Sequence, residues 1–219
     1  MRQSAVPLQR LRGLPRASTQ RTIQRQRPRT DFAGLWETDE LARLTAGVRR
    51  VAHDGAALAG TLCGDLPPLE QTLVSAQTDD VLEMDELMTF VSEKCFKRWL
   101  WTAQCRRTRQ IVAFAIGDRS QDTGRVAWQS MPSAYRRCPV YADRWTAYAH
   151  FLPPEQHSPC DKGSGRTSHQ ERWYNTLRQW LGRYTRRSLS FSKEDRYLKL
   201  VTYWFILEHN LRMRASLTM

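Results

Sequence analysis

The stretch VLEMDELMTFV, residues 81–91, is the first of three apolar or alternating runs that decide the fold. FKRWLWTAQCR, residues 96–106, and QIVAFAIGDR, residues 110–119, follow it with only short polar interruptions. Alternating polarity indicates half-buried strands, and short connections favour antiparallel neighbours. The three runs therefore predict an antiparallel meander.

Beyond the meander the sequence alternates between helical and extended patterns. The expected elements, in chain order, are a helix over 122–131, a short buried strand over 139–145, a helix over 144–152, a loop-rich segment over 154–168 with room for one short strand, and helices over 169–184 and 193–212. Three strands, then alternating helices and strands, then terminal helices is the element order of an RNase H-like domain. We therefore predict a mixed α/β fold of that kind.

The composition of the chain is strongly basic. Lys and Arg total 34 against 22 Asp and Glu, which gives a formal net charge of +12. Such a balance is typical of proteins that bind polyanions and favours nucleic acid as the partner, although charge alone fits a ribosomal or simply basic protein equally well. The five cysteines form no CxxC pair, which argues against a zinc ribbon or a disulfide framework. No membrane-spanning run or signal peptide is visible, so we expect a cytoplasmic protein.

The N-terminal third differs in composition from the rest. Residues 1–30 contain eight Arg, three Pro and no acidic residue, which predicts a disordered basic arm. One short amphipathic helix is expected within residues 31–57, and Gly and Pro residues over 60–68 mark a boundary. We therefore expect a basic, largely disordered region of uncertain origin over 1–65 and a folded domain over 66–215.

Three acidic residues stand where predicted elements begin or end: Asp85, Asp143 and Glu171. Two-metal phosphoryl transfer needs a few carboxylates from separate elements around two divalent ions, and magnesium binds such oxygen ligands while keeping positions open for phosphate and water. The pattern predicts a catalytic carboxylate site for two Mg²⁺ or Mn²⁺ ions. Glu83 and Glu86 flank Asp85, and strand alternation is interpreted as turning both to the opposite face.

The helix expected to carry Glu171 has two distinct sides. Glu171, Asn175 and Arg178 fall on one side of a helical wheel. An apolar stripe occupies the other side and consists of Trp173, Leu177, Trp180, Leu181 and Tyr184. Six Arg and one acid lie between residues 166 and 187, as expected of a nucleic-acid surface, although an ordinary amphipathic helix with solvated arginines fits the same pattern. No role is assigned to His150, His157 or His169.

Several of these motifs together resemble the DDE transposases of the bacterial insertion sequence 1 family, of the InsB or InsAB' type. They are MDEL at 84–87, RWLW followed by IVAFAIGDRS, ADRWTAY at 142–148, and above all QERWYNTLRQWLGRYTRRSLSFSKE at 170–194. The resemblance covers about residues 66–213. The last block is long and specific.

The resemblance implies an RNase H-like enzyme that cuts and joins DNA at the ends of a mobile element with a divalent metal. Asp85, Asp143 and Glu171 match the catalytic triad of the family. Trp145 and Arg178 match positions that follow the second aspartate and the glutamate, and we expect these two, with Arg172 and Asn175, to contact DNA. The family also implies a homo-oligomer that joins two DNA ends, associated with the nucleoid when bound to DNA. The zinc-binding cysteines and helix-turn-helix usual at the start of such proteins are not visible here.

Two other functions fit the sequence. One is a decayed or repurposed transposase fragment that binds DNA without turnover, a reading favoured by the unusual N-terminal region. The other is a hydrolytic nuclease on the same fold, because hydrolysis and strand transfer share one metal site. Metal-dependent cleavage and joining separate the three functions.

Overall fold

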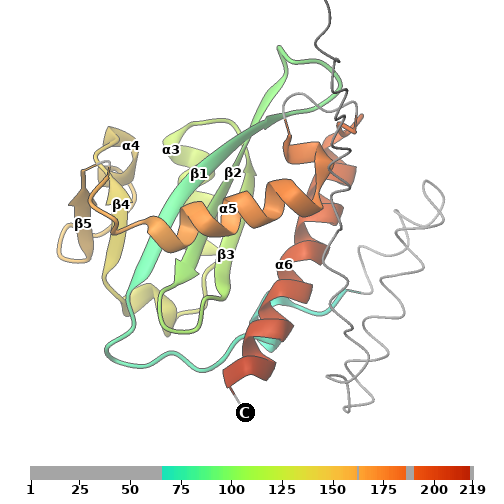
Figure 1. Cartoon of the computed structure of the whole chain (residues 1–219). Helices are drawn as coiled ribbons and strands as arrows, with labels where there is room; N and C mark the ends of the chain where they lie inside the picture. The colour runs from blue at the N-terminus through green and yellow to red at the C-terminus, as the bar shows by residue number, and fades with distance from the viewer. Residues whose placement is uncertain (1–65, 162, 186–189, 218–219) are drawn as a thin grey trace, which may run out of the picture. The chain divides into compact units, whose positions relative to one another are not determined.

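The computed structural model of the chain describes residues 66–161, 163–185 and 190–217. These residues form a five-stranded sheet with the strand order β3-β2-β1-β4-β5 (Figure 1). The strands are β1 Leu82–Phe90, β2 Lys97–Cys105, β3 Ile111–Gly117, β4 Val140–Asp143 and β5 His157–Cys160. The helices are α3 Gln121–Gln129, α4 Thr146–Ala149, α5 Ser168–Trp180 and α6 Asp195–Leu217, with 3-10 turns η2 Leu69–Thr72, η3 Tyr135–Arg137 and η4 Gly182–Tyr184. The predicted basic arm and the helix within 31–57 lie outside the described residues.

Strand β1 is the centre of the sheet. It pairs antiparallel with β2 along its whole length, with Asp85 opposite Thr102, and parallel with β4 on its other side, with Leu82 opposite Val140. Strand β2 pairs antiparallel with β3, and β4 pairs parallel with β5. The predicted antiparallel meander is confirmed, and so is the mixed, RNase H-like α/β fold.

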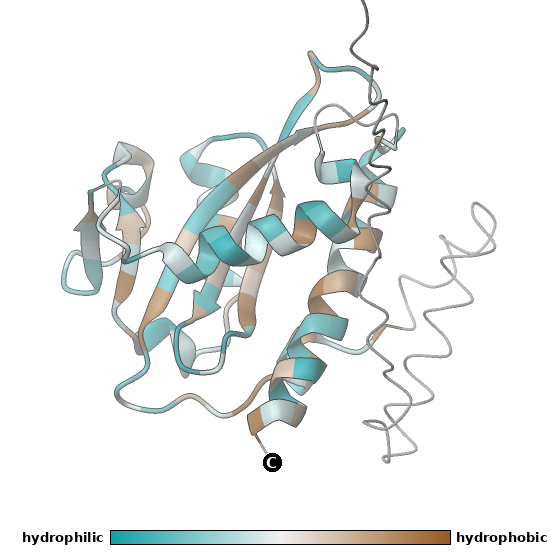
Figure 2. Ribbon diagram, viewed as in Figure 1, coloured by the Kyte–Doolittle hydropathy of each residue, from teal (hydrophilic) through white to brown (hydrophobic). Residues whose placement is uncertain are grey.

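Helices cover both faces of the sheet, because alternate residues of the strands are apolar on each face. On one face Leu82, Met84 and Trp101 pack with side chains from α3 and the α4 region, such as Tyr148. On the other face the apolar side chains of β1–β3 pack with those of α5 and α6, and they include Leu87, Leu100, Ile111, Trp173, Leu177 and Ile206. Figure 2 shows the apolar stretches along the strands and α6. The core is thus two layers separated by the sheet.

Close packing explains the glycine within α3. A Cβ at Gly124 would lie 2.5 Å from the ring of Phe151 and 3.0 Å from that of Trp101. Real side chains do not tolerate the shorter of these contacts, so α3 lies against the sheet at a distance that only glycine permits.

The helix predicted over 169–184 is two elements. Helix α5 ends at Trp180, Leu181 adopts extended angles (φ −110°, ψ 97°) and η4 follows. Gly182 favours this break because glycine is a poor helix former. The η4 turn returns the chain to β1, where the Thr89 hydroxyl donates a 2.8 Å hydrogen bond to the Arg183 carbonyl. Both ends of the α5–η4 segment therefore lie against β1.

The other boundaries differ from the predictions by a few residues. The helix expected over 144–152 is only the four-residue α4. The Asp143 side chain holds the residues before α4 in a turn, and prolines follow the helix at positions 153 and 154. The short strand expected within 154–168 is β5. The last helix, expected over 193–212, runs from Asp195 to Leu217. Among the described residues, no helix combines the length and apolar character that crossing a bilayer requires.

Candidate active site

Asp85 lies in the middle of the central strand, half-buried on the face that α5 covers. Burial is the largest cause that raises the pKa of its carboxyl to about 7 from the ordinary 3.8. The neighbouring negative charge of Glu86 raises it further, and so do the charges of Asp143 and Glu171. A 2.8 Å hydrogen bond from the Glu86 backbone N–H acts in the opposite direction. Asp85 is thus an acid in a region of accumulated negative charge.

Asp143 is the last residue of β4, the parallel neighbour of β1. Leu82 faces Val140 in the ladder, so three residues further along Asp85 and Asp143 lie at the same level of the two strands. The Asp143 carboxylate accepts a 2.9 Å hydrogen bond from the Trp145 backbone N–H, which fixes its direction at the strand end. The ends of parallel strands are common positions for functional groups in α/β sheets.

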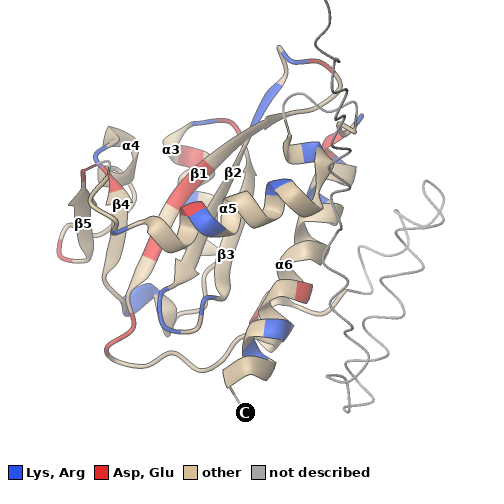
Figure 3. Cartoon of the chain, viewed as in Figure 1, with Lys and Arg blue, Asp and Glu red and all other residues tan. Residues whose placement is uncertain are grey.

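Glu171 lies on helix α5, which covers the sheet face that carries Asp85. It lies in the first turn of α5, its side chain is exposed, and its charge contributes to the raised pKa of Asp85. Figure 3 shows acidic positions along β1 and at the start of α5, where this helix crosses the strand. Asp143 and Glu171 therefore both lie within electrostatic reach of Asp85.

The carboxylates are not arranged as a complete metal site. Among residues 66–161, 163–185 and 190–217, no group of three His, Cys, Asp or Glu side chains is close enough to hold a metal ion. The donor set nevertheless fits a hard divalent cation, because it consists of carboxylate oxygens. A bound cation would also offset the repulsion that raises the pKa of Asp85. The residues present thus suit the metal that the sequence implies.

The prediction that both flanking glutamates face away from Asp85 is wrong for Glu83. Residues two apart on a strand share a face, and the Glu83 carboxylate contacts the start of α5, on the same face as Asp85. Glu86 does face the opposite side, where it accepts hydrogen bonds from Tyr148 Oη at 2.7 Å and Arg119 Nε at 2.9 Å. Burial nonetheless raises the pKa of the Glu86 carboxyl.

His169, which received no role from the sequence, is part of the Glu83 contact. Its Nδ1 lies 2.6 Å from Glu83 Oε1. The contacts of Glu83 with the start of α5 join residues more than 80 positions apart, so no local spacing in the sequence could reveal them. Period-two alternation, counted correctly from Asp85, was the available signal for Glu83.

The residues predicted to contact DNA lie in different settings. Arg172 and Asn175 are exposed on α5, and Arg178 is half-buried with Nη1 3.5 Å from Asn175 Oδ1. Trp145 is half-buried: its ring stacks on Trp101 at 5.3 Å between centroids. The Arg119 guanidinium lies 4.4 Å from the centroid of the Trp145 ring. Trp145 is therefore held firmly beside Asp143, while Arg172 and Asn175 are open to solvent.

The buried face of α5 differs from the predicted apolar stripe in two residues, Trp180 and Tyr174. Trp173, Leu177, Leu181 and Tyr184 are buried as expected, but Trp180 is 52% exposed. Tyr174, outside the predicted stripe, is 3% exposed, and its hydroxyl donates a 2.7 Å hydrogen bond to the Asp85 carbonyl. The helix is rotated slightly from the wheel, so Tyr174 rather than Trp180 faces the sheet.

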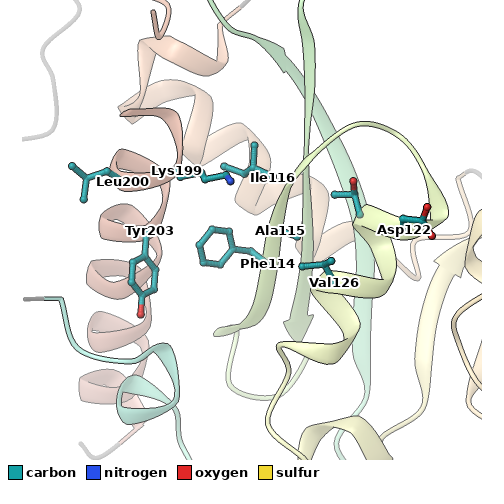
Figure 4. Close-up of a pocket in the computed structure, with 9 residues that line it drawn as sticks. Phe114, Ala115, Ile116, Asp122, Val126, Lys199, Leu200 and Tyr203 are labelled. Carbon is teal, nitrogen blue, oxygen red and sulfur yellow. The ribbon is translucent and has the colours of Figure 1, made fainter. Parts of the chain in front are cut away.

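Two cavities bear on the site. An open cavity of about 370 Å³ lies directly at Asp143, and Arg119, Arg144, Trp145, Cys160 and Asp161 complete its lining. A larger groove of about 560 Å³ lies at the other edge of the sheet, between β3, α3 and α6 (Figure 4). Its lining is mostly apolar and has one acid, Asp122. The groove therefore lacks the carboxylates that the chemistry needs, and the smaller cavity is the one beside them.

The fold is that of an RNase H-like domain, with acidic side chains on its two central strands and on the helix that covers them. The model of the IS1 transposase family matches residues 80–212. The chain is 31% identical over 156 residues to the insertion element IS1 4 protein InsB of Escherichia coli K12, covering 66% of this chain and 90% of that protein. It is 28% identical over 129 residues to the iso-IS1n protein InsB of Shigella dysenteriae, covering 59% of this chain and 95% of that protein.

A third relative, the insertion element IS1 protein InsB of Shigella flexneri, is 33% identical over 128 residues, which is 58% of this chain and 95% of that protein. The chain belongs to the IS1 transposase family. The family resemblance read from the sequence is confirmed. Membership implies a transposase, an enzyme class that acts on DNA.

Proposed function

We propose that the chain is a DNA transposase that catalyses metal-dependent cleavage and strand transfer of an insertion element. Asp85, Asp143 and Glu171 are the proposed catalytic residues. The observation that supports this assignment is that two carboxylates act electrostatically on Asp85 in the middle of β1: Asp143 from the adjacent end of β4 and Glu171 from the first turn of α5. Membership of the transposase family supports the reaction class.

In this proposal the three carboxylates hold two Mg²⁺ or Mn²⁺ ions. When bound, such ions supply activation of the attacking oxygen and stabilisation of the leaving oxygen in an in-line displacement. The rigid central strand fixes Asp85, and the Trp145 N–H keeps the Asp143 carboxylate directed at the strand end. Glu171, on the helix, completes the set from the opposite side. No covalent bond between protein and DNA is required.

The DNA is proposed to lie along the exposed side of α5 and the cavity at Asp143. Arg172 and Arg178 would pair with backbone phosphates, Asn175 would donate its amide to phosphate or sugar, and the Trp145 ring edge would contact the strand next to the scissile bond. Such contacts position a duplex without reading its sequence. Residues 66–215 are the proposed catalytic domain, which would act in the cytoplasm, on the nucleoid, as a homo-oligomer that joins two element ends.

The test is cleavage and joining of element-end DNA with Mg²⁺ or Mn²⁺. Substituting Asp85, Asp143 or Glu171 by Ala should each lower both reactions at least about 100-fold, since each removes a metal-binding carboxylate. Asp122→Ala is the matched control, because Asp122 is a solvent-exposed acid on α3 at the far groove. Full activity in any one of the three variants would show that the triad is wrongly assigned.

The same assay separates the alternatives. Cleavage without joining would identify a hydrolytic nuclease. DNA binding by the unaltered protein without metal-dependent cleavage would identify a non-catalytic transposase remnant. Either result overturns the proposal.

A further inference from the structure

Helix α5 begins without a cap of its own. Its N-cap residue is Thr167, whose side chain makes no capping hydrogen bond. The first backbone N–H groups of a helix have no partner within the helix, and an N-cap side chain normally accepts from the second and third of them. In α5 these groups belong to His169 and Gln170, directly before Glu171.

Glu83 of β1 supplies this cap from a distant part of the chain. Its Oε2 accepts hydrogen bonds from the backbone N–H of His169 at 3.1 Å and of Gln170 at 3.0 Å. Its Oε1 contacts His169 Nδ1 at 2.6 Å and Arg106 Nε at 2.9 Å. The carboxylate is completely buried, with 0% of the side chain exposed. A strand residue thus does what a capping residue normally does, and thereby fixes the end of the helix to the strand.

A second set of hydrogen bonds joins α5 to the same place on the sheet. The Tyr174 hydroxyl donates to the carbonyl oxygen of Asp85 at 2.7 Å. Thr102 faces Asp85 across the β1–β2 ladder, and its hydroxyl lies 2.8 Å from the Tyr174 hydroxyl. The Gln170 side chain donates a hydrogen bond to the Thr102 hydroxyl. Glu171 therefore stands between two attachments of α5 to β1, one on either side of it.

We propose that Glu83 is a positioning residue that holds Glu171 opposite Asp85 by fixing the start of α5 on β1. The inference rests on the proposed function of the triad and deepens it. Glu83 sits two residues before Asp85 on the same face, and its bonds end one residue before Glu171. One short connection thus links two catalytic carboxylates that are far apart in the sequence.

An ordinary buried ion pair provides the contrast. Asp80 is equally buried and accepts from Arg107 Nε at 2.7 Å and from the Gln77 backbone N–H at 2.8 Å. These partners lie in the segments next to the ends of β1 and β2, so Asp80 joins loops without touching α5. Removing either carboxylate takes the charged partner from an arginine and the acceptor from a backbone N–H, and both changes destabilise the fold. Only the Glu83 change also releases α5.

The experiment compares Glu83→Gln with Asp80→Asn. Gln is isosteric with Glu but lacks the charge that binds Arg106, His169 and the helix start. At saturating DNA and metal, Glu83→Gln should cut and join roughly 100-fold more slowly, because a displacement of about 1 Å at a catalytic group costs that much. Its affinity for element-end DNA should stay within about threefold of the unaltered protein. Asp80→Asn should keep the rate within about threefold, with a comparable fall in melting temperature.

Hydrogen exchange gives a readout that needs no catalysis. In Glu83→Gln the amides of His169, Gln170 and Glu171 should exchange faster, with no comparable change in β1, whereas Asp80→Asn should leave these amides protected. Tyr174→Phe, which removes only the second attachment, should lower the rate by a smaller factor and covers the case in which Glu83→Gln does not fold.

Three results would overturn the proposal. They are an unchanged rate in both Glu83→Gln and Tyr174→Phe, an equal loss of rate in Asp80→Asn, and unaltered exchange at the start of α5. Failure of the proposed function would look different. Ala variants of the triad would then remain active, while the exchange difference between Glu83→Gln and Asp80→Asn would persist.

Discussion

Asp85 and Glu86 are adjacent on β1, yet the two faces of the sheet surround their carboxylates very differently. On the α3 and α4 side, Glu86 pairs with Arg119 and accepts from Tyr148 Oη. On the α5 side, the hydrogen bonds of the described residues give the Asp85 carboxylate a single donor, the Glu86 backbone N–H. The nearby charges that act on Asp85 are negative, from Glu86, Asp143 and Glu171.

The difference is the one expected between a structural carboxylate, Glu86, and the carboxylate that we propose as catalytic, Asp85. A buried charge that contributes only to the fold is neutralised by a cation and by hydrogen bonds, as Glu86 is. A cluster of carboxylates that repel one another is costly to the fold and characteristic of sites that bind cations or perform acid–base chemistry. Burial alone does not distinguish the two, because both side chains are removed from water to a large extent. Their partners do.

The largest expected effect is that Asp85 makes the free energy of unfolding depend on pH. Its pKa is about 7 in the folded chain and 3.8 ordinarily, so folding favours the protonated form. The stabilisation is complete below about pH 4 and lost as the pH rises through 7. It amounts to about 2–4 kcal/mol after allowance for partial exposure. Urea denaturation in EDTA from pH 4 to 8 should therefore show Asp85→Asn gaining on the unaltered protein as the pH rises.

Added Mg²⁺ provides the control for this measurement. A bound divalent cation favours the ionised carboxylate, so it should reduce the difference between the two proteins near pH 7. A difference that is constant from pH 4 to 8 would show that neither burial nor the neighbouring charges raise the pKa of Asp85, and the comparison with Glu86 would fail.

The next prediction tests the pairing of Glu86 with Arg119 on the opposite face of the sheet. Arg119→Met keeps an apolar stem of similar length but removes the cation that pairs with Glu86, at 2.9 Å from Nε. Because Arg119 is partly exposed, we expect a loss of about 2 kcal/mol in the free energy of unfolding, less than for a fully buried pair. Chemical denaturation at pH 7 measures it. The double variant Glu86→Gln/Arg119→Met should recover part of the loss, and strictly additive losses would contradict the pairing.

Removing the second partner of Glu86 should cost less. Tyr148→Phe deletes the hydroxyl that donates to Glu86 Oε2 at 2.7 Å and leaves the buried ring in place. A hydrogen bond to a charged acceptor contributes about 1.5 kcal/mol, which is the expected fall in unfolding free energy. Tyr197→Phe, whose hydroxyl contacts exposed Arg196 at 3.2 Å, is the control and should change stability by less than about 0.5 kcal/mol. Equal losses in the two variants would show that Glu86 does not need Tyr148.

The smallest effect should come from Glu171. Glu171→Gln removes one of the negative charges that raise the pKa of Asp85, so the midpoint of the pH dependence described for Asp85 should move to lower pH. Asp161→Asn removes an exposed acid that pairs with Arg144 and does not act on Asp85. An unmoved midpoint in Glu171→Gln, or an equal shift in Asp161→Asn, would place Glu171 outside the site.

Much of this arrangement could be predicted from the sequence. Alternation in residues 81–119 predicted the meander. The prediction of acids at element ends is confirmed for the positions of Asp143 and Glu171 and wrong for Asp85, which lies in the middle of β1. These signals are local, because they depend on periods of two or 3.6 residues and on the residues that end an element. The block at 170–194 further identified the family, since it is long and specific.

The partners of the buried acids could not be predicted in the same way. Glu83 reaches His169, and Glu86 reaches Tyr148, only because β1, α5 and the α4 region pack together in the fold. Hydropathy likewise did not predict that α5 buries Tyr174, which hydrogen-bonds to β1, and exposes Trp180. Sequence patterns show that a side chain is polar. They do not show whether the fold neutralises it.

The two attachments of the α5–η4 segment to β1, through Glu83 at its start and Thr89 near its end, also set a limit on its length. Helix α5 has 13 residues and so spans about 20 Å at 1.5 Å per residue, and the strand from residue 83 to residue 89 spans about 20 Å as well at 3.3 Å per residue. Inserting or deleting one residue between the attachments would rotate part of the helix by about 100°. Length variation among functional relatives should therefore be excluded from this segment and confined to the loops outside it.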